Sequence, residues 1–238
     1  MGLQTVLNRH VTIEGKTKHD DVSIMLRGLI ARLFRRILSI KTQGEDLRSS
    51  DGARVLMVAN HPGLLDPLVL ASLLPIDVLI VVSPEAARTT SLRLAMRSGR
   101  FVELDLSRAV SVRRLSRLVT QHRAVLVFGQ NRVTAPGSAY KLYEAPAIIA
   151  ARSGVPVVPI NIRYGGVGAN GRVSQGVTVT FGADTHIALA AGLPARERRR
   201  QANERMRSLL HEVAVRARPK HTLFDAFLAA LAQNGRRT

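Results

Sequence analysis

The sequence predicts an α/β fold with a mostly parallel central sheet flanked by helices. Short apolar runs such as 54–59, 78–82 and 124–128 alternate with segments that have helical periodicity. Strands that alternate with helices favour parallel pairing through βαβ units. The chain has 238 residues, of which 46% are hydrophobic, and this is enough to bury a sizeable core. We therefore expect residues 1–238 to form a single domain of this class.

The N-terminal segment is expected to combine a flexible arm, residues 1–20, with an amphipathic helix, residues 21–41. Apolar residues recur at helical spacing along the helix and arginines lie among them. Such a helix can dock in a membrane interface, or it can pack on the core with its arginines solvated. The sequence shows no apolar signal region at its start and no apolar stretch of about 18 charge-free residues. A membrane contact is therefore expected to be peripheral, at the cytoplasmic face.

The remaining elements follow in order after a polar loop at 42–53. The expected strands are rich in Val, Ile, Leu or Phe: 54–59, 78–82, 101–104, 124–128, 155–162 and 177–181, the last at a sheet edge. The expected helices are apolar at helical spacing or small and apolar throughout: 68–74, 92–97, 107–122, 145–152, 196–216 and 223–232. In such sheets, reactive groups collect in loops at the carboxyl ends of strands. Two polar loops have that position, 60–66 and 129–138.

The composition excludes several classes of function. The chain has no cysteine, which excludes a disulfide scaffold, a thiolate metal site and a thiol nucleophile. Its formal net charge of +18, carried mostly by arginine, favours a polyanionic partner, unless it is a bias of composition without a partner. Nucleic acid is the weaker choice, because tryptophan is absent, aromatics are few and no zinc-finger or RNP pattern occurs. We expect an anionic membrane surface as partner and no nucleic acid.

A polar cluster interrupts the apolar stretch VANHPGLLDPLVL at residues 58–70, where Asn60, His61 and Asp66 occur together. His61 and Asp66 form an H-x4-D arrangement in a predicted strand–turn–helix. A carboxylate on one imidazole nitrogen fixes the tautomer and lets the other nitrogen take a proton, although the same spacing also suits a structural hydrogen bond. No G-x-S-x-G elbow supplies a serine nucleophile, so the activated hydroxyl is expected to belong to a substrate. No further His or carboxylate has metal-ligand spacing, and no metal is expected.

Four blocks in this order resemble the glycerolipid acyltransferases, the lysophosphatidate and lysophospholipid acyltransferase family. They read NHPGLLD at 60–66, SGRFVELD at 98–105, VLVFGQNRVT at 125–134 and VPVVPI at 155–160. The sequence is most similar to the acyltransferase domain of the bifunctional acyl-ACP synthetase/2-acylglycerophosphoethanolamine acyltransferase. GSAYKLYE at 137–144 and RPKHTLFDA at 218–226 also resemble segments of that domain.

The resemblance implies roles for the residues of these blocks. His61 would be the general base for a lysophospholipid hydroxyl, and Asp66 would orient and stabilise its imidazolium. Arg132 would bind the acceptor phosphate, which suits a planar guanidinium. Acyl-ACP or acyl-CoA would be a cosubstrate, with no cofactor. Three neighbours would also contact substrate: Asn60, Gln130 and Asn131.

The third block departs from the family pattern. Gly129, Gln130 and Asn131 stand where the family has Pro, Glu and Gly, and Leu106 stands where an Arg often follows the second block. Gln130 keeps the hydrogen-bonding shape of Glu without its charge. Two readings remain open: an active enzyme in which Gln130 suffices, and a catalytically impaired homologue that binds lipid or membrane.

Overall fold

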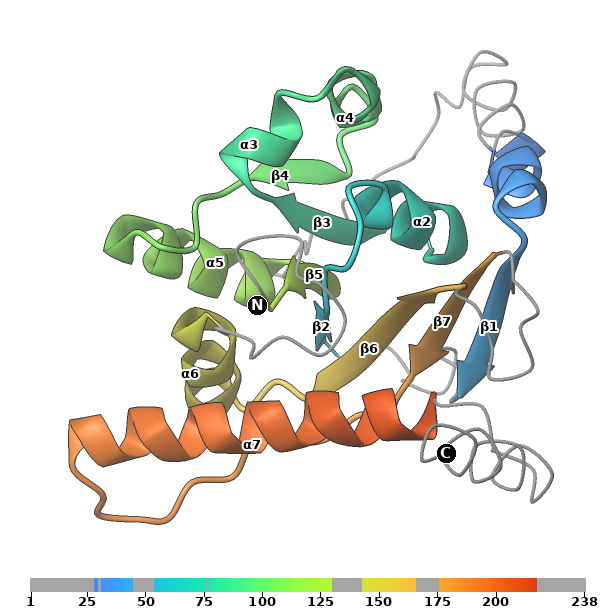
Figure 1. The fold of residues 1–238 in the computed structure, drawn as a ribbon. Coiled ribbons are helices and arrows are strands. Elements are labelled where there is room, and N and C mark those ends of the chain that lie inside the picture. Colours follow the sequence, from blue (N-terminus) through green and yellow to red (C-terminus); the bar gives the residue numbers. More distant parts are fainter. Residues whose placement is uncertain are drawn as a thin grey trace, which may run out of the picture.

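The computed structural model shows a sheet between two layers of helices, which confirms the predicted α/β class (Figure 1). It describes residues 28–29, 31–44, 54–75, 77–129, 143–165 and 176–217. The described strands are β1 Ile40–Gly44, β2 Val55–Ala59, β3 Val78–Val82, β4 Phe101–Glu103, β5 Ala124–Phe128, β6 Val157–Tyr164 and β7 Val177–Phe181. The described helices are α2 Asp66–Leu73, α3 Pro84–Ala87, α4 Thr90–Met96, α5 Ala109–Gln121, α6 Glu144–Ser153 and α7 Ala195–Arg216, together with an N-terminal helix at 28–29 and 31–37.

The strand order within the described residues is β1-β7-β6-β2-β5-β3-β4. Strands β6, β2, β5, β3 and β4 run parallel, while β7 is antiparallel to β6 and β1 is parallel to β7. The carboxyl ends of the five parallel strands therefore meet at one edge of the sheet. Strands β2 and β5, which precede the two polar loops predicted from the sequence, both end at this edge, where ligands bind in open α/β sheets.

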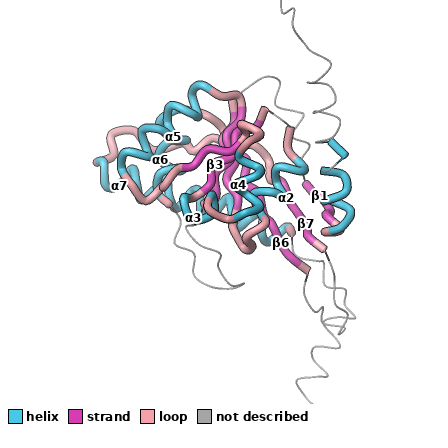
Figure 2. Tube along the Cα trace, turned by 90° about the horizontal axis from the view of Figure 1, so that it is seen from above, coloured by secondary structure: helices cyan, strands magenta, loops and turns pink. Residues whose placement is uncertain are grey.

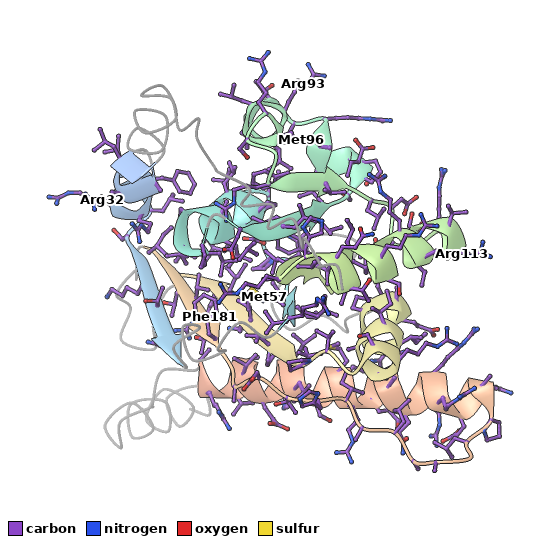
Figure 3. The ribbon with its side chains drawn as sticks, turned by 180° about the vertical axis from the view of Figure 1, so that it is seen from behind. Arg32, Met57, Arg93, Met96, Arg113 and Phe181 are labelled. Atoms are coloured by element: carbon purple, nitrogen blue, oxygen red, sulfur yellow. The ribbon has the colours of Figure 1, made fainter. Side chains whose placement is uncertain are left out.

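The core consists of two clusters, one on each face of the sheet. Leu56 and Val58 of β2 face the cluster covered by α5, α6 and α7, whereas Met57 faces the cluster on the side of α2 and α4. This alternation is the period of two that a strand imposes on its side chains. Figure 2 shows the two helical layers on opposite sides of the strands. Arg32 and Arg113 extend outward at the periphery of the molecule (Figure 3).

The N-terminal helix ends before the predicted residue 41, because its last described helical residue is 37. Ser39 has a φ of 46°, a left-handed conformation that breaks the helix, and β1 begins at the next residue. Residues up to Gly44 then pair with β7, so the predicted loop 42–53 starts too early. The sequence hides β1 because the side chains of this edge strand are mostly exposed and polar.

The prediction of an edge position for β7 is wrong, since it lies between β6 and β1. Gly44 permits the close pairing at the end of β1, because it has a φ of 98° and a side chain there would collide with the carbonyl of Phe181. Other predicted ends shift by a few residues, and the short helix α3 was not predicted. The predicted arm 1–20 and helix 223–232 lie outside the described residues. None of the helices in the described part of the chain is long and apolar enough to cross a bilayer.

Candidate active site

Just after the end of β2, the side chain of Asn60 takes the place of a peptide group in the hydrogen bonding to β6. Its Nδ2 donates to the carbonyl of Ile162 at 2.9 Å, and its Oδ1 accepts from the Ile162 N–H at 2.6 Å. A side-chain amide has the same donor and acceptor pair as a peptide group, so Asn60 extends the β2–β6 ladder by one step. The backbone N–H of Asn60 still donates to the carbonyl of Ile160, and beyond this residue the chain leaves the sheet and turns toward His61. This places the imidazole at the carboxyl edge of the parallel strands.

His61 and Asp66 meet as the sequence predicts. His61 Nδ1 lies 2.8 Å from Asp66 Oδ2, and the side chains are 12% and 0% exposed. Asp66 is the first residue of α2 and is followed by Pro67, which suits the first turn of a helix. The positive end of the helix dipole favours a carboxylate at this position. Since an ionised carboxylate only accepts hydrogen bonds, Nδ1 carries the proton and Nε2 is the basic nitrogen.

Two further donors satisfy the buried carboxylate. The backbone N–H of Gly63 donates to Asp66 Oδ2 at 2.8 Å, and Tyr164 Oη donates to Oδ1 at 2.7 Å. Burial, and then the hydrogen bond and the charge of Asp66, raise the pKa of Tyr164, so its phenol stays protonated as the donor. Sequence reasoning missed Tyr164, because it is 98 residues from Asp66 in the chain. Only the pairing of β2 with β6 brings the two together.

An apolar wall stands beside the imidazole. The Phe128 ring lies 4.7 Å from the His61 ring, centroid to centroid, at 36°. A small cavity of about 30 Å³ adjoins them and is lined by His61, Pro67, Val81, Val82, Ser83, Ala86, Leu104, Leu106, Phe128 and Tyr143. This volume is of the order needed for one water molecule. Burial, and then the charges of Asp105 and Glu85, raise the pKa of Tyr143 to about 12, so this lining residue is neutral at physiological pH.

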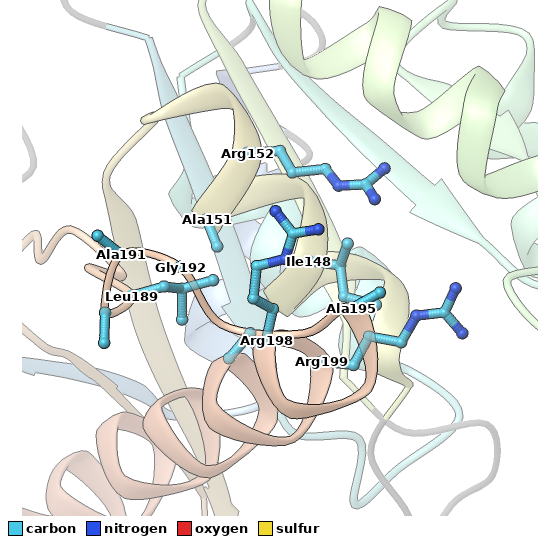
Figure 4. A pocket seen from close by; sticks show the side chains of 11 residues that line it. Ile148, Ala151, Arg152, Leu189, Ala191, Gly192, Ala195, Arg198 and Arg199 are labelled. Atoms are coloured by element: carbon cyan, nitrogen blue, oxygen red, sulfur yellow. The ribbon is translucent and has the colours of Figure 1, made fainter.

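A larger cavity, of about 330 Å³, lies between α6, the segment 189–192 and the start of α7 (Figure 4). Arg152, Arg198 and Arg199 line it together with small and aliphatic residues. Helix α6 starts at the carboxyl edge of β5 and runs back toward the start of β6, so Arg152 near its end lies at the opposite edge from His61. The larger cavity is therefore separate from the His61–Asp66 pair.

The described structure thus brings together two of the predicted site residues, His61 and Asp66. Asn60 is adjacent, but both ends of its amide already bond to Ile162, and substrate binding by Asn60 stays a prediction. Three predicted site residues lie outside the described residues: Gln130, Asn131 and Arg132. Leu106, which stands where the family often has Arg, is buried and contributes to the apolar lining. Within the described ranges, no three His, Asp or Glu side chains group as metal ligands would.

The fold and the site define an α/β protein with a hydrogen-bonded His–Asp pair at the carboxyl edge of its sheet, beside the ring of Phe128. The model of the Acyltransferase family matches residues 39–163, more than half of the chain, and the chain belongs to this family. The fold is similar to a crystal structure of the 1-acyl-sn-glycerophosphate (LPA) acyltransferase PlsC from Thermotoga maritima. The TM-score is 0.55 at 17% sequence identity, with 87% of this chain and 86% of that chain covered.

Proposed function

We propose that this protein is an O-acyltransferase that moves a fatty acyl group from a thioester to the hydroxyl of a lysophospholipid. The observation that carries the proposal is the 2.8 Å contact between His61 and the fully buried Asp66, in a chain of the Acyltransferase family. A structural hydrogen bond alone would not require a carboxylate to be fully buried at the start of α2, where burial costs stability. A base at this position is the simplest use of the pair.

The proposed reaction is a direct transfer. His61 Nε2 takes the proton of the acceptor hydroxyl as the oxygen attacks the thioester carbonyl. The tetrahedral oxyanion collapses, the C–S bond breaks and the thiolate leaves with the proton from the imidazolium. Asp66 holds the ring in the required tautomer and stabilises its positive charge. General-base catalysis of this kind contributes about 10²–10⁴-fold.

Acceptor binding is assigned to the segment that follows β5. Gly129 donates its N–H to the carbonyl of Ala59 at 2.8 Å, and its carbonyl accepts from the N–H of Tyr143 at 2.9 Å. The two ends of segment 130–142, at Gly129 and Tyr143, are therefore held together beside Ala59, the residue before Asn60. This supports a role for Arg132 in binding the acceptor phosphate, with Gln130 and Asn131 beside it.

The identity of both substrates is part of the proposal. The resemblance to the bifunctional synthetase/acyltransferase favours acyl-ACP as donor and a 2-acylglycerophosphoethanolamine as acceptor, with acyl-CoA and lysophosphatidate as the other pair to be tested. No cofactor enters the reaction as written. The apolar lining beside His61 suits the reacting end of an acyl chain.

The N-terminal helix supports a membrane-bound orientation. Leu29, Leu33 and Ile37 recur every four residues and are 62%, 57% and 69% exposed, so they form one apolar stripe on the helix. Phe34, on another side of the helix, packs against the core cluster that α2 also joins. Leu64, between His61 and Asp66, is 71% exposed. We assign these exposed side chains to a peripheral contact with an anionic lipid surface, with Arg32 and Arg36 exposed on the same helix.

The membrane assignment is tested with vesicles. Leu33→Glu combined with Ile37→Glu is expected to reduce cosedimentation with vesicles of phosphatidylglycerol and phosphatidylethanolamine by at least tenfold. Val215→Glu is the control, because Val215 is also exposed but lies on α7 and not on the N-terminal helix. Equal loss in both proteins would refute the assignment.

The activity is tested by supplying labelled acyl-ACP or acyl-CoA with a set of lysophospholipids and following the diacyl product by mass spectrometry. His61→Ala is expected to lower the rate by at least 10²-fold. His211→Ala is the matched control, since His211 is exposed on α7. Equal product from wild type and His61→Ala would overturn the proposal.

A second candidate, a catalytically impaired homologue that binds lipid or membrane, is favoured by Gly129-Gln130-Asn131 in the third block. The variant Gln130→Glu restores the carboxylate of the family pattern. A large gain in turnover would support the impaired homologue, and unchanged turnover would show that Gln130 suffices.

A further inference from the structure

Asp66 receives hydrogen bonds on both of its oxygens, from three donors in two different parts of the fold. Oδ2 accepts from His61 Nδ1 and the Gly63 N–H, while Oδ1 accepts from Tyr164 Oη. The first two donors lie in the same turn as Asp66. The third comes from the last residue of β6, across the end of the sheet.

The two oxygens of a carboxylate are fixed in one plane, so a donor on one oxygen restrains the other. Asp66 side-chain torsions would otherwise be free to rotate about the single bonds that lead to the carboxylate, and this would turn Oδ2 away from His61. With Tyr164 on Oδ1, rotation breaks a charge-assisted hydrogen bond at 2.7 Å. Because the Asp66 side chain is 0% exposed, water does not easily replace the lost donor.

The turn between His61 and Asp66 has a glycine, Gly63, where it contacts the Tyr164 ring. A side-chain carbon at Gly63 would lie 2.7 Å from Tyr164 Cε2 and 2.8 Å from Cζ and Oη. Only a glycine leaves room for the ring at this distance. Gly63 thus serves the carboxylate twice, through its own N–H and through the space it leaves for the phenol.

We propose that Tyr164 is a positioning residue for the His61–Asp66 pair, whose hydroxyl holds the carboxylate in the orientation that keeps the imidazole ready to accept a proton. The inference rests on the proposed function and adds to it a residue from the end of β6. Tyr164 acts through Asp66 and is not assigned a contact with substrate. The hydroxyl also disperses the negative charge of the carboxylate, so its loss makes the pair bind a proton more readily.

The test is Tyr164→Phe, which keeps the ring and removes only the hydroxyl. We expect kcat to fall about tenfold, within the range for losing a hydrogen bond to a charged group, while KM for the acceptor changes by less than twofold. The acidic limb of the pH–kcat profile is expected to move to higher pH. Thr180→Val is the matched control for loss of a sheet hydroxyl, because Thr180 lies on β7 and makes no contact with the pair. It is expected to match wild type in all three quantities.

Site-specific replacement of Tyr164 by 3-fluorotyrosine is expected to shift the pH–kcat profile in the direction opposite to Tyr164→Phe. The more acidic phenol donates a stronger hydrogen bond, so the acidic limb is expected to move to lower pH. This variant keeps every atom of the native contact, so it also tests the role of the Tyr164 hydroxyl if Tyr164→Phe does not fold. A profile that does not move in either protein, or a loss that resides entirely in KM, would overturn the inference.

A readout without substrate separates this inference from the proposed function. The ring-proton NMR resonance of His61, identified by its disappearance in His61→Ala, is followed against pH. Its transition is expected to move upward in Tyr164→Phe, and an unchanged transition would refute the role of Tyr164. If wild type shows this coupling but transfers no acyl group, the proposed function fails while the positioning contact stands.

Discussion

Replacing Asn60 by alanine separates a structural role from a substrate-binding role for this residue. The substitution removes two hydrogen bonds, of 2.9 Å and 2.6 Å, that join the end of β2 to Ile162 of β6. Each such bond contributes about 0.5–1.5 kcal/mol net. Because Asn60 is partly exposed, water can reach some of the groups left behind, so we take the middle of that range for each bond. The expected loss is about 2 kcal/mol in the free energy of unfolding.

This loss has a measurable thermal signature. For a chain of this size, 1 kcal/mol corresponds to about 2–4 °C in Tm, so Asn60→Ala is expected to lower Tm by about 4–8 °C. Asn60→Asp is the informative companion, because a carboxylate keeps an acceptor for the Ile162 N–H but faces the Ile162 carbonyl without a donor. It is expected to be at least as destabilising as the alanine variant.

The assay is thermal unfolding followed by circular dichroism, together with KM for the lysophospholipid. A lower Tm with KM nearly unchanged would support the structural role. If Asn60→Ala unfolds at the wild-type temperature and instead raises KM severalfold, the assignment of its amide to Ile162 is refuted and substrate binding is supported.

Three further predictions concern packing and hydrogen bonding at the turn of the site, at the end of α2 and in β7. Gly63→Ala is expected to lower kcat at least tenfold and to lower the free energy of unfolding by about 1–3 kcal/mol, because the added carbon would overlap the Tyr164 ring. A variant with wild-type turnover and wild-type Tm would contradict this packing. Arg100→Lys is expected to lower Tm by about 2–6 °C, because the Arg100 guanidinium donates to the carbonyls of Ala71, Leu74 and Pro75 at the end of α2 and an ammonium cannot span all three. Thermal unfolding measures the loss, and an unchanged Tm would argue against this cap. Thr180→Val is expected to raise the free energy of unfolding by about 1 kcal/mol, because the buried Thr180 hydroxyl has no hydrogen-bond partner among the described atoms. A marked fall in the free energy of unfolding would mean that a water molecule hydrogen-bonds to this hydroxyl.

Local contacts were the part of the site that the sequence predicted well. His61 and Asp66 lie in one turn, and the chain itself keeps them within reach whatever the rest of the fold does. The proline after Asp66 and the apolar residues around the turn also indicate a helix start after a buried strand. The catalytic roles drawn from the family resemblance remain predictions, and so do those of Gln130 and Arg132.

Contacts across the sheet could not be predicted in the same way. Asn60 reaches Ile162 over 102 residues, and Tyr164 reaches Asp66 over 98. No local pattern marks either partner. Both contacts depend on β6 being the neighbour of β2, and the sequence predicts the two strands without predicting that they are adjacent.

The sequence by itself determined most of the strands and helices, with β1 and α3 as the exceptions, and it determined the His61–Asp66 pair. Hydrophobic periodicity and turn-forming residues act over a few neighbouring positions, so they can be recognised from local sequence. Only the tertiary structure decided that β1 joins the sheet beside β7, that Asn60 fastens β2 to β6, and that Tyr164 completes the hydrogen bonds of Asp66. These depend on strand order, which is selected by the packing of the whole core and not by any single segment.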